Sequence, residues 1–163
     1  MVSKAVFSSE NMNWRTPKYL YDYLDREFFF DFDPCPSNAN FDGLKIKNWS
    51  AMNFVNPPYG RTELPKWIKK GIEEQKKKHY SVFLIPSRTD VKWFYKMFYH
   101  ATEIRFVVRR INFLDENGKK RLDKNGKEMS APFPSMIVYF GPKERFNNIF
   151  STPKISMVEI PRR

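Results

Sequence analysis

The feature that most constrains this chain is a short apolar run that ends in two prolines. Residues 52–55 lead directly into Asn56-Pro57-Pro58-Tyr59. Each proline lacks an N–H and fixes its own φ, so a strand that reaches Val55 ends there in a rigid corner. The Asn56 amide oxygen and the Pro57 carbonyl can both accept hydrogen bonds from one planar amino group, and the Tyr59 ring offers a face for a base. The corner therefore predicts a site for an amino-bearing base, with an ordinary strand-turn-helix junction as the structural alternative.

The charge balance points to a polyanionic partner. Lysine and arginine number 29 against 18 aspartates and glutamates, which gives a net charge of +11 on 163 residues. Such a surplus favours phosphate contacts and counterion release, so nucleic acid is the expected partner. A protein that binds an acidic membrane surface, or a soluble protein that merely avoids its isoelectric point, would carry the same charge.

Composition bounds the remaining choices. The length predicts one domain over residues 1–163, and 41% hydrophobic residues are enough for an ordinary core. The single cysteine, Cys35, excludes an internal disulfide and indicates a reducing compartment. With only His79 and His100 as imidazoles, we expect no zinc and assign no metal ligands. No apolar run approaches the roughly 20 residues that span a bilayer, so we expect a cytoplasmic protein without membrane contact.

Periodicity predicts alternating helices and strands. Thr16 as N-cap and Pro17 as first residue open a helix that runs to about Arg26, with Leu20 and Leu24 inward. Aromatic alternation over residues 28–33 indicates a strand, as do residues 52–55 and the continuous apolar run of residues 80–86. Helices are expected from Pro65, with its lysines on a solvated face, and from Val91 to about His100.

The C-terminal half reads as two β segments, residues 104–113 and 136–140, separated by a polar loop. Asp115-Glu116-Asn117-Gly118-Lys119 recurs as Asp123-Lys124-Asn125-Gly126-Lys127, and each Asn-Gly favours a tight turn. We expect a small β-ribbon within residues 112–132. A calcium loop would need a carboxylate at its twelfth position, where Gly126 and Pro134 stand.

Several motifs in order resemble one enzyme family. Trp14-Arg15-Thr16-Pro17, Phe32-Asp33-Pro34-Cys35-Pro36, Asp42-Gly43-Leu44, Trp49, the Asn56–Arg61 corner and Trp67 are similar to the phage-type DNA N6-adenine methyltransferases. The resemblance implies an α/β fold of the reduced Rossmann-like methyltransferase type, with a mostly parallel sheet and a C-terminal β-hairpin or ribbon. It also implies methyl transfer from S-adenosylmethionine to adenine in DNA by direct in-line attack. If the chain is phage-encoded, this reaction would take place in the host cytoplasm.

The resemblance assigns roles to individual residues. Asn56, Pro57, Pro58 and Tyr59 would be catalytic, and the cofactor contacts would be Trp14, Thr16, Pro17, Asp33, Pro34, Asp42 and Asn56. Asp42 suits a ribose hydroxyl, although Asp42-Gly43 is equally a simple turn. This chain has Asp33-Pro34-Cys35-Pro36 where most such enzymes carry a glycine-rich loop. Pro34-Cys35 also resembles the nucleophile motif of cytosine C5 methyltransferases, but amino methylation needs no covalent adduct.

DNA contacts are expected from basic residues beside the corner and in the polar loop: Arg61, Arg88, Arg109, Arg110, Lys119, Lys120, Arg121, Lys124 and Lys127. The DNA would be single-stranded or would present a flipped base. Only about 22 residues separate Asp33 from Asn56, too few for two full βα units, so a loop should hold the adenosine end. Two alternatives stay open: an amino methyltransferase acting on RNA or protein glutamine, and a catalytically silent nucleic-acid-binding module. The oligomeric state is not predicted.

Overall fold

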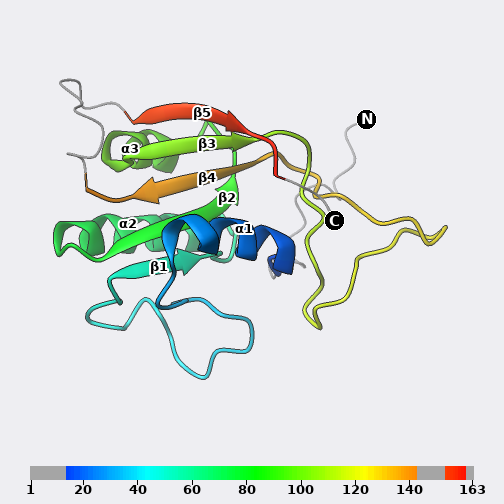
Figure 1. The fold of residues 1–163 in the computed structure, drawn as a ribbon, viewed down its shortest axis with the longest axis horizontal. Coiled ribbons are helices and arrows are strands. Elements are labelled where there is room, and N and C mark those ends of the chain that lie inside the picture. The colour runs from blue at the N-terminus through cyan, green and yellow to red at the C-terminus, as the bar shows by residue number, and fades with distance from the viewer. Residues whose placement is uncertain (1–13, 143–152, 161–163) are drawn as a thin grey trace.

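The computed structural model describes residues 14–142 and 153–160, which form one mixed five-stranded sheet (Figure 1). The strand order is β1-β2-β4-β3-β5. β1 pairs with β2, and β3 with β5, in parallel, whereas β4 is antiparallel to both of its neighbours. The strands are β1 (Met52–Val55), β2 (Tyr80–Pro86), β3 (Glu103–Val107), β4 (Ser135–Phe140) and β5 (Lys154–Val158).

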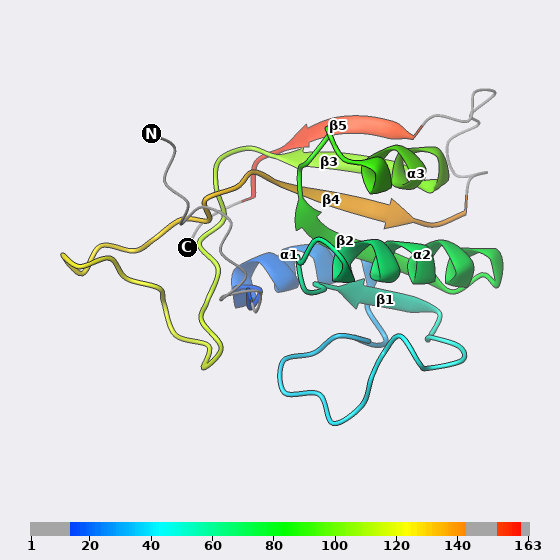
Figure 2. The same ribbon diagram turned by 180° about the vertical axis from the view of Figure 1, so that it is seen from behind.

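Helices cover both faces of the sheet. α1 (Lys18–Phe28) lies on the face turned to the viewer in Figure 1. α2 (Glu63–Lys76) and α3 (Lys92–His100) lie on the opposite face, as the reverse view in Figure 2 shows. The α/β class is therefore confirmed. The expected mostly parallel sheet is wrong, since two of the four strand pairings are antiparallel. Both involve β4, which lies between β2 and β3 and runs opposite to them.

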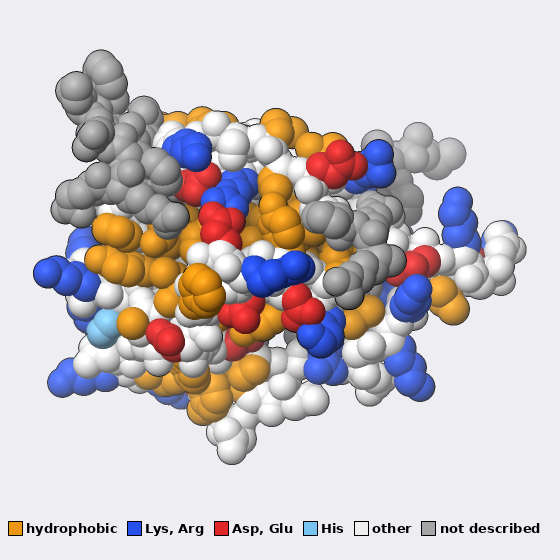
Figure 3. All heavy atoms as spheres, in the orientation of Figure 1, with side chains coloured by type: hydrophobic (Ala, Val, Ile, Leu, Met, Phe, Trp, Pro, Cys, Tyr) orange, Lys and Arg blue, Asp and Glu red, His pale blue; other side chains and the backbone are white. Residues whose placement is uncertain are grey.

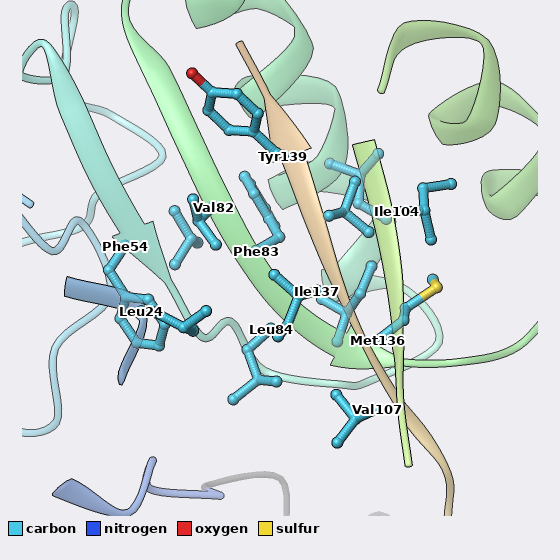
Figure 4. Close-up of a cluster of buried hydrophobic side chains, with 14 of the residues drawn as sticks. Leu24, Phe54, Val82, Phe83, Leu84, Ile104, Val107, Met136, Ile137 and Tyr139 are labelled. Carbon is cyan, nitrogen blue, oxygen red and sulfur yellow. The ribbon is translucent and has the colours of Figure 1, made fainter. Parts of the chain in front are cut away.

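The core is built from the two continuous apolar strands at the centre. Every residue of β4 is buried, and in β2 only the first residue is partly exposed. Central strands with helices over both faces have no solvent side, so they carry unbroken apolar runs instead of alternating ones. Side chains from α1 and four strands meet in this core (Figure 4): Leu24, Phe54, Val82, Phe83, Leu84, Ile104, Val107, Met136, Ile137 and Tyr139.

The strand expected at residues 28–33 does not form. Phe28 is instead the last residue of α1, where its ring packs on Tyr139, and Phe29 ends the helix in the left-handed region at φ 54°. Only Phe32 makes a β-bridge, in parallel with Asn53 of β1. The aromatic alternation was therefore misread: Phe28 belongs to the helical stripe of Leu20 and Leu24, all three of which are buried.

A buried carboxylate joins the end of α2 to the loop before β1. Glu74 is fully buried and accepts hydrogen bonds from Lys70, Lys77, His79 and the backbone N–H of Trp49. Lys70 also reaches the Ile46 carbonyl at 2.6 Å. The expectation that the α2 lysines all lie on a solvated face is therefore wrong for Lys70, whose side chain is mostly buried.

Residues 108–134, here called the arm, project beyond the sheet (Figure 1). In each repeat the aspartate carboxylate accepts from the N–H groups two and four residues later, and Gly118 and Gly126 take φ near +75°. The tight turns are thus confirmed. The ribbon is reduced to single bridges, Leu114 with Lys120 and Leu122 with Glu128. β3 ends at Val107, earlier than expected, and Arg109 then takes a positive φ.

Candidate active site

The candidate site is a cavity at the end of the sheet where β1 and β2 finish. Ligands of open α/β sheets bind outside the carboxyl ends of the strands, and the arm leaves the sheet at this same end (Figure 1). The cavity holds about 780 Å³, within the range of small-molecule sites. It is lined by Trp14, Arg15, Thr16, Lys18, Tyr21, Asp22, Asp33, Cys35, Pro36, Ser37, Asn38, Phe54, Asn56, Pro57, Pro58, Leu114, Glu116 and Gly118.

The Asn56 amide is held on three sides. Its Nδ2 donates to the Trp14 carbonyl and, at 2.9 Å, to Thr16 Oγ1. Its Oδ1 accepts from the Tyr59 hydroxyl at 2.6 Å. Both amide hydrogens are therefore engaged, whereas a carbonyl-type oxygen has two lone pairs and one of them remains for another donor.

Tyr59 lies behind the corner and does not line the cavity. Its ring is only 6% exposed and meets Phe113 and Phe133 edge-on, with centroids 6.2 and 5.5 Å away. The Tyr59 hydroxyl also lies 3.0 Å from the Leu84 carbonyl. Burial raises the pKa of Tyr59 well above its ordinary value, so the hydroxyl keeps its proton and remains a donor. This corrects the expectation that the ring offers a free stacking face.

Asp33 is a cavity carboxylate whose titration is altered by burial. Burial raises the pKa of Asp33 to about 6, against the opposing hydrogen bond that its Oδ1 accepts from the Cys35 N–H at 2.8 Å. Asp33 follows the bridge at Phe32, so its side chain is placed where this extra strand segment ends. Near neutral pH it is an ionised, half-buried group suited to a cationic ligand.

The Cys35 thiol is not activated as a nucleophile. Burial, followed by the nearby charges of Asp33 and Asp42, raises the pKa of Cys35 to about 12. An attacking cysteine is a thiolate at working pH. The thiol is thus a wall of the cavity, consistent with its interpretation as packing or turn material.

The cavity gathers four of the seven predicted cofactor residues. Trp14, Thr16, Asp33 and Asn56 line it. Pro17, Pro34 and Asp42 do not. Pro17 is the N-cap residue of α1. Pro34 is buried, and its carbonyl oxygen packs so closely on Gly43 that a Cβ added at Gly43 would lie 1.9 Å from it.

Two local expectations change as a result. Asp42 is exposed and accepts from the Leu44 N–H, so it stabilises a turn and does not reach the cavity as a ribose ligand would. Thr16 is no helix cap, because α1 has Pro17 at its N-cap without a side-chain cap bond. The Thr16 hydroxyl is used on Asn56 instead.

Charged residues that the sequence interpretation missed complete the cavity. Arg15 and Lys18 bring positive charge, whereas Asp22 and Glu116 bring negative charge. Lys18 and Asp22 form an i,i+4 ion pair at 2.7 Å, a spacing visible in the sequence. The approach of Glu116 has no local signal: it depends on a backbone bridge between Arg15 and Leu114, far apart in the chain.

The basic residues expected to contact DNA fall into two groups. Arg61, Arg109, Arg110, Lys119, Lys120, Lys124 and Lys127 are exposed, Arg88 is half-buried, and lysines and arginines spread along the arm at the right of Figure 3. Arg109 and Lys120 pair with Glu159 and Glu128 at 3.4 and 3.3 Å. Arg121 is different: its guanidinium lies over the Trp14 ring, 4.1 Å from the ring centroid, and its role as a DNA contact stays a prediction.

No helix in residues 14–142 or 153–160 is both long and apolar enough to cross a membrane.

Comparison with known proteins identifies the family. The family model described as DNA N-6-adenine-methyltransferase (Dam) matches residues 4–159, nearly the whole chain. A comparison with curated proteins gives no match.

Proposed function

Because this chain belongs to the DNA N-6-adenine-methyltransferase (Dam) family, we propose that it transfers a methyl group from S-adenosylmethionine to the N6 amino group of adenine in DNA. The observation that carries this proposal is the Asn56 amide at the wall of the cavity, oriented so that its oxygen can accept a further hydrogen bond. The adenine amino group is a hydrogen-bond donor, so the acceptor has the required sense.

The chemistry needs an activated amino nitrogen. The lone pair of an adenine amino group is delocalised into the ring, which makes the nitrogen a weak nucleophile. Acceptors at Asn56 Oδ1 and the Pro57 carbonyl would hold its two N–H bonds and localise that pair for in-line attack on the sulfonium methyl. The S–CH₃ bond would break as the N–CH₃ bond forms, S-adenosylhomocysteine would leave, and the methylated nitrogen would lose one proton to water. Orientation of this kind supplies a large part of the acceleration in two-substrate reactions.

The donor set of the cavity fits S-adenosylmethionine. When bound, this cofactor supplies an electrophilic methyl group on a sulfonium. Its charged amino-acid end carries an ammonium and a carboxylate. Asp33, Asp22 and Glu116 would face the cationic groups, and Arg15 or Lys18 would bind the carboxylate. Asp33 and residues 35–38 line the cavity and would take the place of the usual glycine-rich loop.

DNA would approach along the arm. We infer that the exposed lysines of the arm bind phosphates and that the target adenine, unpaired or flipped, enters beside Asn56. The buried Tyr59 ring does not support stacking on that base, so another group would supply it.

The proposal is tested by the transfer of radiolabelled methyl from S-adenosylmethionine to unmethylated DNA, RNA and protein, with the modified nucleosides identified. We expect N6-methyladenine in DNA, and at least a hundredfold less product from Asn56→Ala, since the amide positions the nucleophile directly. Asn48→Ala, at an exposed asparagine outside the cavity, is the matched control.

Other outcomes contradict the proposal in distinguishable ways. Product in RNA or on glutamine with none in DNA would change the substrate class. DNA binding without cofactor binding or transfer would identify a silent module.

A further inference from the structure

We propose that Thr16 and Tyr59 are positioning residues: their hydroxyls, together with the Trp14 carbonyl, lock the Asn56 amide with its oxygen toward the target amino group. This inference rests on the proposed function and assigns two side chains that act through Asn56. The predicted roles of these residues were different, since Thr16 was expected at the cofactor and Tyr59 beneath the base.

The Trp14 carbonyl decides which way the amide faces. A carbonyl can only accept, so it must meet the NH₂ side of Asn56, as it does here. If the amide rotated by 180°, two oxygens would face each other there. The Thr16 hydroxyl accepts the second amide hydrogen at 2.9 Å, which fixes the plane of the group as well as its sense.

The Tyr59 hydroxyl holds the other side. It donates to Asn56 Oδ1 at 2.6 Å from a buried position, and it lies 3.0 Å from the Leu84 carbonyl of β2. Hydrogen bonds in a site of low polarity are stronger and costly to leave unmade. The Asn56 oxygen is thereby held by a buried hydroxyl that lies beside β2, and the remaining lone pair of the oxygen is left for the substrate.

Loss of either hydroxyl would loosen this orientation. The Trp14 carbonyl still opposes full rotation, but an amide that has lost one of its other two hydrogen bonds can tilt, and its oxygen then meets the substrate NH₂ at a poorer angle. Substrate binding depends on many other contacts, whereas the orientation matters at the moment of transfer. The structure therefore predicts a defect in kcat with little change in the KM for S-adenosylmethionine.

The test compares variants that differ only in a hydroxyl. Thr16→Val and Tyr59→Phe should each lower kcat about tenfold or more, with the KM for S-adenosylmethionine within about twofold. Thr16→Ser keeps the hydroxyl and should retain most of the rate, which a role in packing the methyl group would not explain. The exposed Thr89→Val serves as the control.

A second readout does not need catalysis. In the wild-type protein, the side-chain NH₂ resonances of Asn56 should exchange slowly with water, and exchange should accelerate in Thr16→Val. Unchanged kcat in both variants, or equal loss in Thr16→Ser and Thr16→Val, would overturn the inference. A wild-type protein that binds cofactor but transfers no methyl would overturn the proposed function instead, and the exchange rates would still decide whether the amide is locked.

Discussion

At the scale of single residues, the Asp33 carboxylate of the cavity lies where burial disfavours its ionised form. Asp33 is half-buried and holds a pKa of about 6, well above the 3.8 of an ordinary aspartate. The folded state therefore binds the proton of Asp33 more tightly than the unfolded state does. Stability from this group is present below about pH 4 and is lost as the pH rises through 6, so at neutral pH the carboxylate is maintained at a cost to stability. Such a cost is expected where a charged group serves a ligand.

Replacement of this carboxylate should separate stability from binding. Asp33→Asn should raise the free energy of unfolding at pH 8 by roughly 1–3 kcal/mol, because the buried charge is removed. The same change should weaken S-adenosylmethionine binding at pH 8 and abolish the rise in affinity expected between pH 5 and 7. Urea unfolding and calorimetric titration measure the two effects, and Asp42→Asn, outside the cavity, is the control. Equal affinity in Asp33→Asn and wild type would remove Asp33 from the cofactor site.

At the scale of elements, α2 depends on a carboxylate that no motif identified. Burial alone would raise the pKa of Glu74, but hydrogen bonds from Lys70, Lys77, the Trp49 N–H and His79 lower it to about 2. The lowered pKa means that the stabilisation is present above about pH 4.5 and is lost as the pH falls toward 2. The hydrogen bond from the Trp49 N–H to Glu74 thus joins the end of α2 to the loop that leads into β1 and the corner.

Glu74→Gln should therefore cost about 3 kcal/mol at pH 7, since it leaves two lysines facing a neutral group in a buried setting. The difference from wild type should narrow as the pH falls below 4.5. Chemical denaturation across pH 2.5–7 measures it. Glu73→Gln is the control: Glu73 is exposed, and its Oε1 lies 3.8 Å from Lys69 Nζ. This change should alter the free energy of unfolding by less than about 0.5 kcal/mol. An equal loss of stability in both variants would contradict the role of Glu74.

The same elements explain how far sequence reasoning reaches. β1, β2 and α2 were predicted well, because continuous apolar runs and a helical stripe report burial directly. The end of α1 was missed because Phe28 fits a helical stripe and a strand alternation equally well, and its contact with Tyr139 decides between them. The Asn56 motif was found, but its partners Thr16 and Trp14 lie about 40 residues away, where spacing carries no information.

At the scale of the whole molecule, the arm is both a wall of the cavity and an exposed basic segment. Leu114, Glu116 and Gly118 line the cavity, whereas the lysines of the arm face solvent. The arm is fastened to the start of the described chain by the bridge between Arg15 and Leu114 and by the bond from Arg15 Nη1 to the Glu116 carbonyl at 3.0 Å. One segment thus joins the proposed phosphate contacts to the proposed cofactor site.

This arrangement predicts a local electrostatic footprint. Glutamine at Lys119, Lys120, Lys124 and Lys127 should weaken DNA binding and reduce the slope of log affinity against log salt by up to about 3. Glutamine at four exposed helix lysines, Lys66, Lys69, Lys76 and Lys96, changes the net charge equally and should leave most of the slope intact. Fluorescence anisotropy from 50 to 300 mM salt would measure both, and equal slopes in the two variants would place the DNA elsewhere.

The Trp14 carbonyl, which orients Asn56, has an evolutionary consequence. A backbone oxygen is present whatever side chain the codon specifies, so substitution at position 14 cannot delete this contact, whereas a shift of one residue in the bridge between Arg15 and Leu114 would displace it. Selection on this segment should therefore act against insertions and deletions more strongly than against amino-acid replacement. The contact proposed to orient Asn56 is then hard to lose by point mutation and easy to lose by an insertion or deletion.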